Sequence, residues 1–202
     1  MKRISVFITT IGRETLIDML SSLVNELTDK DYLYIFIDGK NNEPKARLII
    51  DSVINSFVCQ VIITVEDEPL GHWGHGLRNK YQSTLKGDYI MHADDDDIYI
   101  KGSFNKIREK INETDNTDTI FYYKFYHQYR FNQIVWKTPK LMFANIGTPC
   151  GVIPNKPELF GEWKYRHGGD YDFYMACKFT NQVFVDEIIY VVKPLDNGYK
   201  FN

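Results

Sequence analysis

Residues 76–97 read GLRNKYQSTLKGDYIMHADDDD, and the fold prediction begins from this stretch. It opens with apolar residues at helical spacing, Leu77, Tyr81 and Leu85, which predict an amphipathic helix. A short apolar run at 88–93 follows and is typical of a buried strand. Four consecutive aspartates, 94–97, come directly after that run. We therefore expect a helix, a buried strand and then a strongly acidic strand end.

The same alternation of strand and helix extends toward the N-terminus. Short apolar runs predict strands, in chain order, at 4–8, 32–37, 61–65 and 88–93. Apolar residues at helical spacing predict the intervening helices at 16–27, 44–57 and 77–85. Such alternation implies an α/β fold with a mostly parallel central sheet and helices on both of its faces.

The second half of the chain has a different pattern. Its expected elements are a helix at 104–111, aromatic-rich strands at 120–129 and 131–136, a helix at 170–178 and a last strand at 183–192. The two aromatic strands are expected to be antiparallel. Prolines and glycines between 147 and 161 predict a loop. With no internal repeat or linker, residues 1–202 are expected to form one domain with a smaller antiparallel, loop-rich C-terminal half.

Composition excludes several classes of function. The 202 residues contain 24 Lys and Arg against 27 Asp and Glu, a net charge of −3. Binding to a nucleic-acid backbone needs a basic excess, so no nucleic-acid partner is expected. No apolar run approaches the roughly 20 residues that span a bilayer, so no transmembrane segment is expected. The three cysteines are widely spaced, which favours a reducing, cytoplasmic location.

The acidic run is the most informative feature of the sequence. Side chains alternate along an extended segment, so Asp94 and Asp96 are expected on one side, with Asp95 and Asp97 on the other. Close carboxylates repel, and burial raises their pKa values unless a cation offsets the charge. Oxygen ligands suit a hard divalent ion, so the run predicts a site for Mn²⁺ or Mg²⁺. A solvated acidic turn is the alternative, but apolar residues flank this run on both sides.

Residues 76–97 resemble the stretch that contains the DxD motif in GT-A glycosyltransferases, especially those of family 2. There an Arg-Asn pair opens a helix, a Gly-acidic-Tyr-Ile sequence enters a strand, and the strand ends in the acidic motif. The matching residues are Arg78-Asn79, Gly87-Asp88-Tyr89-Ile90 and Asp94-Asp95-Asp96. The resemblance extends over residues 4 to about 178 and implies the Rossmann-like GT-A fold.

Three further segments are similar to the same family. Thr9-Thr10 with Gly12-Arg13 looks like its first nucleotide-contacting loop, and Asp38 is similar to an aspartate that contacts base or ribose. Gly168 to Phe173 resembles the segment whose aspartate, here Asp170, is the catalytic base. Gly169 stands where the family usually has Glu.

The resemblance implies a metal-dependent transfer of a sugar from a nucleoside-diphosphate sugar, with UDP favoured, to an acceptor hydroxyl of a glycan or glycoprotein, with inversion. Residues 1–100 would bind the donor and 101–202 the acceptor. Asp170 would be the catalytic base. The expected nucleotide-sugar-binding residues are Thr9, Thr10, Arg13, Asp38, Arg78, Asp94 and Asp95. The expected ligands of Mn²⁺ or Mg²⁺ are Asp96, Asp94 and, from its closeness to Asp170, His167.

Several of these roles have alternatives. Arg78 could form an ordinary ion pair with a neighbouring carboxylate instead of supporting the anionic donor. Asp170 could cap the helix at 170–178, in which case Asp172 is the reserve candidate for the base. His72 and His75, in the glycine-punctuated loop 71–76, are equally compatible with closing over the donor and with a surface role.

Three other functions compete with sugar transfer. A sugar-phosphate nucleotidyltransferase needs a glycine-rich loop after the first strand, where residues 9–13 hold a single glycine. A metal-dependent phosphatase usually carries its paired aspartates on the first strand, whereas three strands precede them here. A non-catalytic nucleotide- or carbohydrate-binding module would keep Asp38 and the metal site but tolerate loss of Asp170.

Overall fold

A single mixed sheet organises the protein. The computed structural model describes residues 1–114, 116–129 and 132–194. Within them the strands are β1 (Ile4–Thr10), β2 (Tyr32–Ile37), β3 (Gln60–Val65), β4 (Tyr89–Asp94), β5 (Asp97–Tyr99), β6 (Thr119–His127), β7 (Gln133–Val135), β8 (Gly151–Pro154) and β9 (Asn181–Val192). Their order is β3-β2-β1-β4-β8-β6-β9-β5, with β7 paired to β6.

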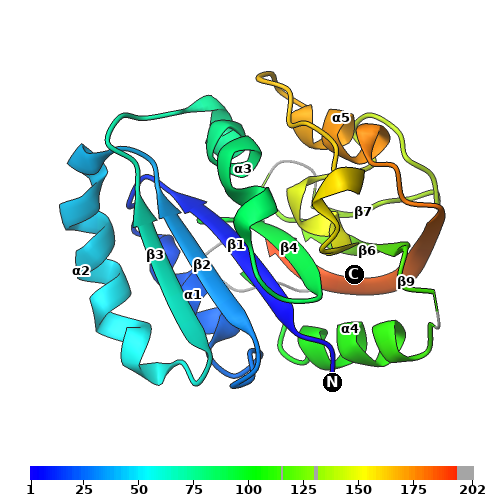
Figure 1. The fold of residues 1–202 in the computed structure, drawn as a ribbon, viewed down its shortest axis with the longest axis horizontal. Coiled ribbons are helices and arrows are strands. Elements are labelled where there is room, and N and C mark those ends of the chain that lie inside the picture. The colour runs from blue at the N-terminus through cyan, green and yellow to red at the C-terminus, as the bar shows by residue number, and fades with distance from the viewer. Residues whose placement is uncertain (115, 130–131, 195–202) are drawn as a thin grey trace.

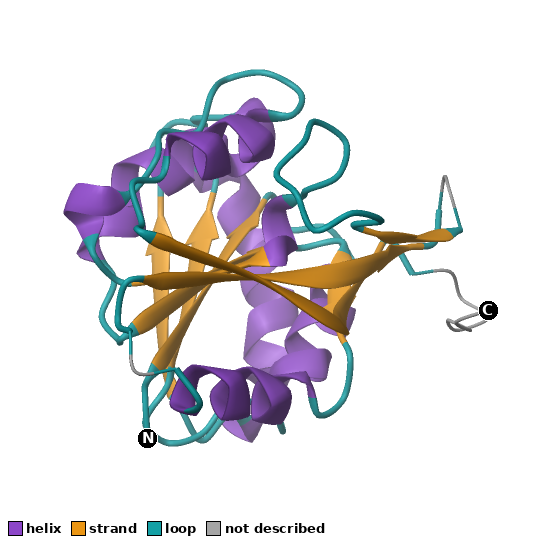
Figure 2. Cartoon of the chain, turned by 90° about the vertical axis from the view of Figure 1, so that its right-hand side faces the viewer, coloured by secondary structure: helices purple, strands orange, loops and turns teal. Residues whose placement is uncertain are grey.

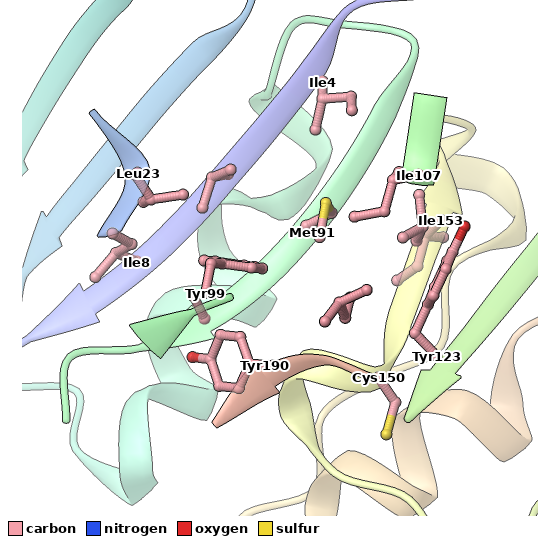
Figure 3. Close-up of a cluster of buried hydrophobic side chains, with 14 of the residues drawn as sticks. Ile4, Ile8, Leu23, Met91, Tyr99, Ile107, Tyr123, Cys150, Ile153 and Tyr190 are labelled. Carbon is pink, nitrogen blue, oxygen red and sulfur yellow. The ribbon is translucent and has the colours of Figure 1, made fainter. Parts of the chain in front are cut away.

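Helices cover both faces of this sheet, as predicted (Figures 1 and 2). They are α1 (Leu16–Leu23), α2 (Glu43–Val53), α3 (His75–Tyr81), α4 (Ser103–Asn112) and α5 (Gly169–Ala176). Alternation along β1 shows the two faces: Val6 and Ile8 belong to the core cluster that includes α1, α2 and α4, whereas Phe7 packs with Leu77 of α3. Figure 3 shows part of the larger cluster, from Ile4 and Leu23 to Tyr190.

The four strands of the first half are parallel neighbours, and their predicted positions are confirmed. β1 pairs with β2 and β4, and β2 pairs with β3. The register sets Thr9 opposite Asp94 and Thr10 opposite Ile37. Because parallel strands end at the same edge, the Thr9-Thr10 segment, Asp38 and the acidic run all meet there. Ligands generally bind at this edge of an open α/β sheet.

The second half departs from the sequence prediction at two strands. The region expected to be loop contains β8, which lies between β4 and β6 and is antiparallel to both. Pro154 is tolerated because it is the last residue of β8, where a missing N–H disturbs the ladder least. The short strand β5, which was not predicted, pairs with the end of β9.

The remaining predictions for this half hold. β6 and β7 form the expected antiparallel pair, although Phe131, at the start of the second predicted strand, lies outside the described residues. α4, α5 and β9 occupy the segments expected for two helices and a final strand. Among the helices that the structure describes, none is both long enough and apolar enough to cross a membrane.

Candidate active site

A cavity of about 320 Å³ lies at the carboxyl ends of β1, β2 and β4. Six of the seven residues predicted to bind the nucleotide sugar line it, namely Thr9, Thr10, Arg13, Asp38, Asp94 and Asp95. Asp96, predicted as a metal ligand, also lines it. The parallel register of β1 with its two neighbours brings these side chains together from three separate segments.

Arg78, the seventh residue, lies behind the cavity wall. Its side chain is fully buried, and one guanidinium nitrogen lies 2.5 Å from Asp94 Oδ1. The same group donates to the carbonyl oxygens of Trp73 and Ala93, at 2.9 and 3.1 Å, and lies 4.9 Å from the centre of the Trp163 ring. Arg78 therefore ties the glycine loop to the end of β4 and fixes the Asp94 carboxylate. This arrangement is the ion pair that the sequence left open as an alternative.

Asp95 and Asp96 share a cation. Arg13 Nη1 lies 3.2 Å from Asp95 Oδ1 and 2.9 Å from Asp96 Oδ2. The Thr10 hydroxyl donates a 2.6 Å hydrogen bond to Asp95. Burial raises the pKa of Asp95, while Thr10 and Arg13 act in the opposite direction. A second cation, Lys193, lies 3.4 Å from Asp96 Oδ2.

Asp97 does not line the cavity. Its side chain is buried, and Oδ1 accepts a 2.8 Å hydrogen bond from the backbone N–H of Lys193. Burial raises the pKa of Asp97 well above its ordinary value, with further increases from Asp94 and Asp96. The four aspartates thus differ in environment: Asp94 and Asp96 are half-buried in the cavity wall, whereas Asp95 and Asp97 are buried.

Asp38 positions the glycine loop. Its carboxylate accepts hydrogen bonds from the backbone N–H groups of Leu70 and Gly71, at 2.6 and 2.9 Å. Further along this loop, Gly74 has a φ of +79°, and a Cβ there would lie 2.3 Å from Thr9 Oγ1. Only glycine therefore allows the loop to pass so close to β1. The next helix, α3, begins immediately after it.

The loop places two aromatic residues beside the cavity. Trp73 has a φ of +55° and its side chain is exposed, whereas His75 is buried. His75 Nδ1 lies 2.8 Å from the carbonyl oxygen of Lys164, and burial together with Arg78 lowers the pKa of the imidazole. His75 is therefore a neutral wall residue, while Trp73 presents an open aromatic face.

A second cavity, of about 260 Å³, adjoins the first and shares Trp73, His75, Asp94 and Thr148 with it. Asp170 and His167 line this second cavity. Burial raises the pKa of Asp170, and the negative charge of Asp94 raises it further. A carboxylate with a raised pKa is a stronger proton acceptor than an ordinary aspartate.

Asp170 does not cap helix α5. The N-cap position of α5 belongs to Gly168, and no side chain caps it. Asp170 lies inside the first turn, where Oδ1 accepts a 2.8 Å hydrogen bond from the N–H of Tyr171. The reserve candidate, Asp172, is bound through both oxygens by Arg166, at 2.6 and 2.7 Å. Asp170, not Asp172, lines the cavity.

Glycine at position 169 has a local reason. A Cβ there would lie 2.2 Å from the carbonyl oxygen of Lys164 and 2.7 Å from His75 Cε1. His75 and the chain at Lys164 therefore fill the space that a longer side chain at 169 would occupy. This packing leaves no room at position 169 for the Glu that the family usually has there.

The predicted metal ligands do not form a ready-made metal centre. Within residues 1–114, 116–129 and 132–194, no group of three or more His, Cys, Asp or Glu side chains is arranged to hold a metal ion. Asp94 and Asp96 line the first cavity, whereas the exposed His167 lines only the second. Of the three predicted ligands, the first cavity therefore has the carboxylates of Asp94 and Asp96 on its wall.

Thr148 and Lys193 are among the lining residues that the sequence prediction missed. Thr148 lies in both cavities and follows the Gly147 turn that precedes β8, the strand that the sequence did not reveal. Lys193 directly follows β9, and only the pairing of β9 with β5 brings it beside the acidic run. Neither residue belongs to a local motif that could have indicated it.

The chain is similar to known proteins in sequence and in fold. The family model described as Glycosyl transferase family 2 matches residues 5–179. No curated protein matches the chain. Among solved structures, the crystal structure of S. aureus TarS 1-349 is 15% identical with a TM-score of 0.71 and covers 95% of this chain and 60% of that chain.

Two further TarS structures are similar. The complex of TarS 1-349 with UDP-GlcNAc is 14% identical with a TM-score of 0.71, covering 97% of this chain and 59% of that chain. The longer TarS structure has a TM-score of 0.69 at 14% identity and covers 95% and 36%. The chain thus spans about three fifths of the length of TarS 1-349. At these identities the likeness concerns the fold, and it agrees with the expected GT-A architecture. Because the family model covers most of the residues, the chain belongs to glycosyl transferase family 2, as its resemblance predicted.

Proposed function

We propose that this protein transfers a sugar from a nucleoside-diphosphate sugar, with UDP as the favoured nucleotide, to an acceptor hydroxyl. The observation that carries the proposal is the pair of joined cavities, one lined by Asp94 and Asp96 and the other by Asp170. Family membership supports transfer from a nucleotide sugar. The structural likeness to TarS in complex with UDP-GlcNAc supports UDP.

The donor is assigned to the first cavity. Thr9, Thr10 and Asp38 lie on the side formed by β1 and β2, where the nucleoside would bind. Arg13 is about half exposed and can exchange its carboxylate partners for the phosphate oxygens of the donor. Arg78 is fixed behind the wall and holds Asp94 in position.

The donor set of this cavity fits a hard divalent ion. Two carboxylates, Asp94 and Asp96, line the same cavity, and Mg²⁺ is commonly bound by one or two carboxylates together with substrate phosphates. Asp96 is the proposed principal ligand and Asp94 the second, with Mn²⁺ or Mg²⁺ as the ion. When bound, such an ion supplies Lewis-acid stabilisation of the diphosphate leaving group. His167 is the proposed additional ligand with the least geometric support, because it lines only the other cavity.

Asp170 is the proposed base. It takes the proton of the acceptor hydroxyl as that oxygen forms a bond to the anomeric carbon. The bond from that carbon to the diphosphate oxygen breaks, and the electron pair leaves with the nucleoside diphosphate. Inversion, with attack from the side opposite the leaving group, is proposed because the resemblance to the family implies it.

The acceptor is assigned to the second cavity and is proposed to be a glycan or glycoprotein. Trp73, Phe143 and Tyr171 supply aromatic rings to its wall, and Trp73 and Phe143 are exposed. Flat aromatic faces pack well against the C–H faces of sugar rings. This division keeps donor binding mainly in residues 1–100 and acceptor binding in 101–202 of a single domain. The cytoplasm remains the proposed location, supported by the three free thiols.

Release of nucleoside diphosphate tests the proposal. UDP-, GDP- and dTDP-sugars are incubated with the protein and a panel of glycan acceptors, with Mn²⁺ or with a chelator. Acceptor-dependent release that requires Mn²⁺ and is lost in Asp170→Asn is expected. Tight nucleotide binding without turnover, unchanged in Asp170→Asn, would instead identify a binding module. Release of inorganic diphosphate from a nucleoside triphosphate and a sugar phosphate would identify a nucleotidyltransferase.

A further inference from the structure

Lys193 is a cation of the donor cavity that the family match does not cover. It lies beyond residues 5–179, to which the family model extends. Its side chain nevertheless lines the 320 Å³ cavity together with Asp94, Asp95 and Asp96. Its Nζ lies 3.4 Å from Asp96 Oδ2, a long contact for an ammonium and a carboxylate.

The backbone of Lys193 is held in place by Asp97. The Lys193 N–H donates to Asp97 Oδ1 at 2.8 Å, and the Asp97 side chain is buried. Asp97 itself stands opposite Val192 in the β5–β9 pairing. Lys193 has a φ of +50°, a conformation that non-glycine residues adopt at a cost and that needs local support. Asp97 thus fixes the backbone at the point where the chain leaves β9.

Two cations contact one oxygen of Asp96, and one of them, Arg13, is shared with Asp95. Arg13 lies 2.9 Å and Lys193 3.4 Å from the same oxygen, Oδ2. The two cationic side chains are 45% and 51% exposed, so each can reorient without opening the core. Arg78 is different, since its side chain is 0% exposed. A long, half-exposed lysine next to a cavity lined by hydroxyls and carboxylates is suited to reach a phosphate oxygen.

We infer that Lys193, positioned by Asp97, is a phosphate-binding residue that exchanges Asp96 for the diphosphate oxygens of the donor. This inference rests on the proposed function and adds a residue to the same site. When the Lys193 ammonium binds the phosphate oxygens, it releases the Asp96 carboxylate. Asp96 would then be available to bind the divalent ion. Lys193 therefore recognises the diphosphate part of the ligand and has no role toward the nucleoside.

Calorimetric titration of the whole chain tests this assignment. UDP and uridine are titrated into wild type, Lys193→Met and Lys193→Arg, each with Mn²⁺ and with a chelator. Lys193→Met is expected to weaken UDP binding about tenfold, the value of one charge-assisted hydrogen bond, and to leave uridine binding unchanged. Lys193→Arg is expected to recover most of the UDP affinity. The matched control is Lys106→Met, which removes an equally exposed lysine paired with Glu187 instead of with the acidic run.

A second pair of variants tests the positioning by Asp97. Asp97→Asn keeps an acceptor oxygen for the Lys193 N–H and is expected to retain UDP affinity, whereas Asp97→Ala is expected to lose UDP affinity as Lys193→Met does. Circular dichroism checks that both variants fold. If Asp97→Ala does not fold, the Lys193 variants still test phosphate binding by Lys193.

Two results would overturn the assignment alone: UDP affinity in Lys193→Met equal to that of wild type, or an equal loss of UDP and uridine affinity. Wild type that binds none of UDP, GDP and dTDP would overturn the proposed function itself.

Discussion

The guanidinium of Arg78, fully buried, lies 2.5 Å from the Asp94 carboxylate, which forms part of the wall of both cavities. One residue comes from helix α3 and the other from the end of β4, so this ion pair joins a helix to the strand that carries the acidic run. Removing Asp94 leaves a fully buried guanidinium without its counter-charge, whereas removing Arg78 leaves a half-buried carboxylate, so the two removals are not equivalent.

Arg78→Met is expected to destabilise the fold by about 3 kcal/mol, the lower end of the cost of breaking a buried pair, because Asp94 retains some contact with water. Asp94→Asn is expected to cost less, since Arg78 keeps its carbonyl acceptors. Urea unfolding of both single variants and the double variant measures the coupling between the two residues. Strictly additive effects would show that the contact contributes nothing to stability.

Asp170→Asn is expected to lower kcat by a factor of about 10² to 10⁴, the usual contribution of a general base, with little change in the KM for the donor. Asn retains the oxygen that accepts from the Tyr171 N–H, so the local backbone is preserved. The matched variant is Asp172→Asn, whose carboxylate is bound by Arg166 and which is expected to stay active. Loss of activity in Asp172→Asn with retention in Asp170→Asn would reverse the two assignments.

The raised pKa of Asp170 is expected to make the stability of the protein depend on pH. Burial raises the pKa of Asp170 above 3.8, so the native state binds this proton more tightly than the unfolded chain does. The contribution of the group to stability is therefore present at low pH and decreases as pH rises from 3.8 through the raised pKa. Asp170→Asn removes the ionisation, and its Tm is expected to exceed that of wild type at neutral pH.

Thermal melts between neutral pH and about pH 4 check this expectation, because the difference between variant and wild type should shrink as the pH is lowered. A Tm difference that stays constant over that range would mean that Asp170 titrates alike in the folded and unfolded states.

Nucleotide is expected to stabilise the protein only when a divalent ion can bind at Asp96. A ligand that binds only the native state raises its stability in proportion to occupancy, so UDP with Mn²⁺ is expected to raise the Tm of wild type. Chelation of the ion and the substitution Asp96→Ala are each expected to abolish most of this increase. Asp186→Ala is the control, since that exposed aspartate pairs with Lys124 away from the cavities. An increase that persists in Asp96→Ala would place the ion elsewhere.

How far the sequence predicts this molecule depends on how local each signal is. The acidic run could be assigned a place because 88–93 is an apolar strand and the ends of parallel strands share an edge. The neutralisation of that run could be foreseen only for Arg78, whose ion pair with a neighbouring carboxylate was one alternative. Arg13 and Lys193 reach the run from distant segments, so their ion pairs could not be predicted. Sequence spacing contains no information on which cation meets which carboxylate.

The second half of the fold resisted prediction for a related reason. β8 has four residues and ends in a proline, so its glycine and proline signals outweighed a strand pattern too short to recognise. Its existence depends on β4 and β6, which it pairs with on either side. Thr148 enters the site only through the placement of this strand, and Lys193 only through the pairing of β5 with β9.

Gly74→Ala tests the close approach of the glycine loop to β1, and Gly102→Ala is a closely matched control. Both glycines are N-cap residues of helices with left-handed backbones, φ +79° and ψ 2° at Gly74 and φ +85° and ψ 1° at Gly102. A Cβ at Gly102 has no atom within 4 Å, whereas one at Gly74 would lie 2.3 Å from Thr9 Oγ1. Gly102→Ala should therefore cost only the conformational strain, about 1 kcal/mol, with unchanged nucleotide binding.

Gly74→Ala adds a steric conflict to the same strain and must displace either Thr9 or the loop that presents Trp73. It is expected to destabilise the protein more than Gly102→Ala does and to weaken UDP binding as well, since Thr9 and Gly74 both line the donor cavity. Urea unfolding and calorimetric titration of the two variants separate the effects. Equal losses of stability with equal UDP affinities would mean that the loop relaxes away from β1 without consequence for the site, and that the contact between Gly74 and Thr9 does not shape the donor cavity.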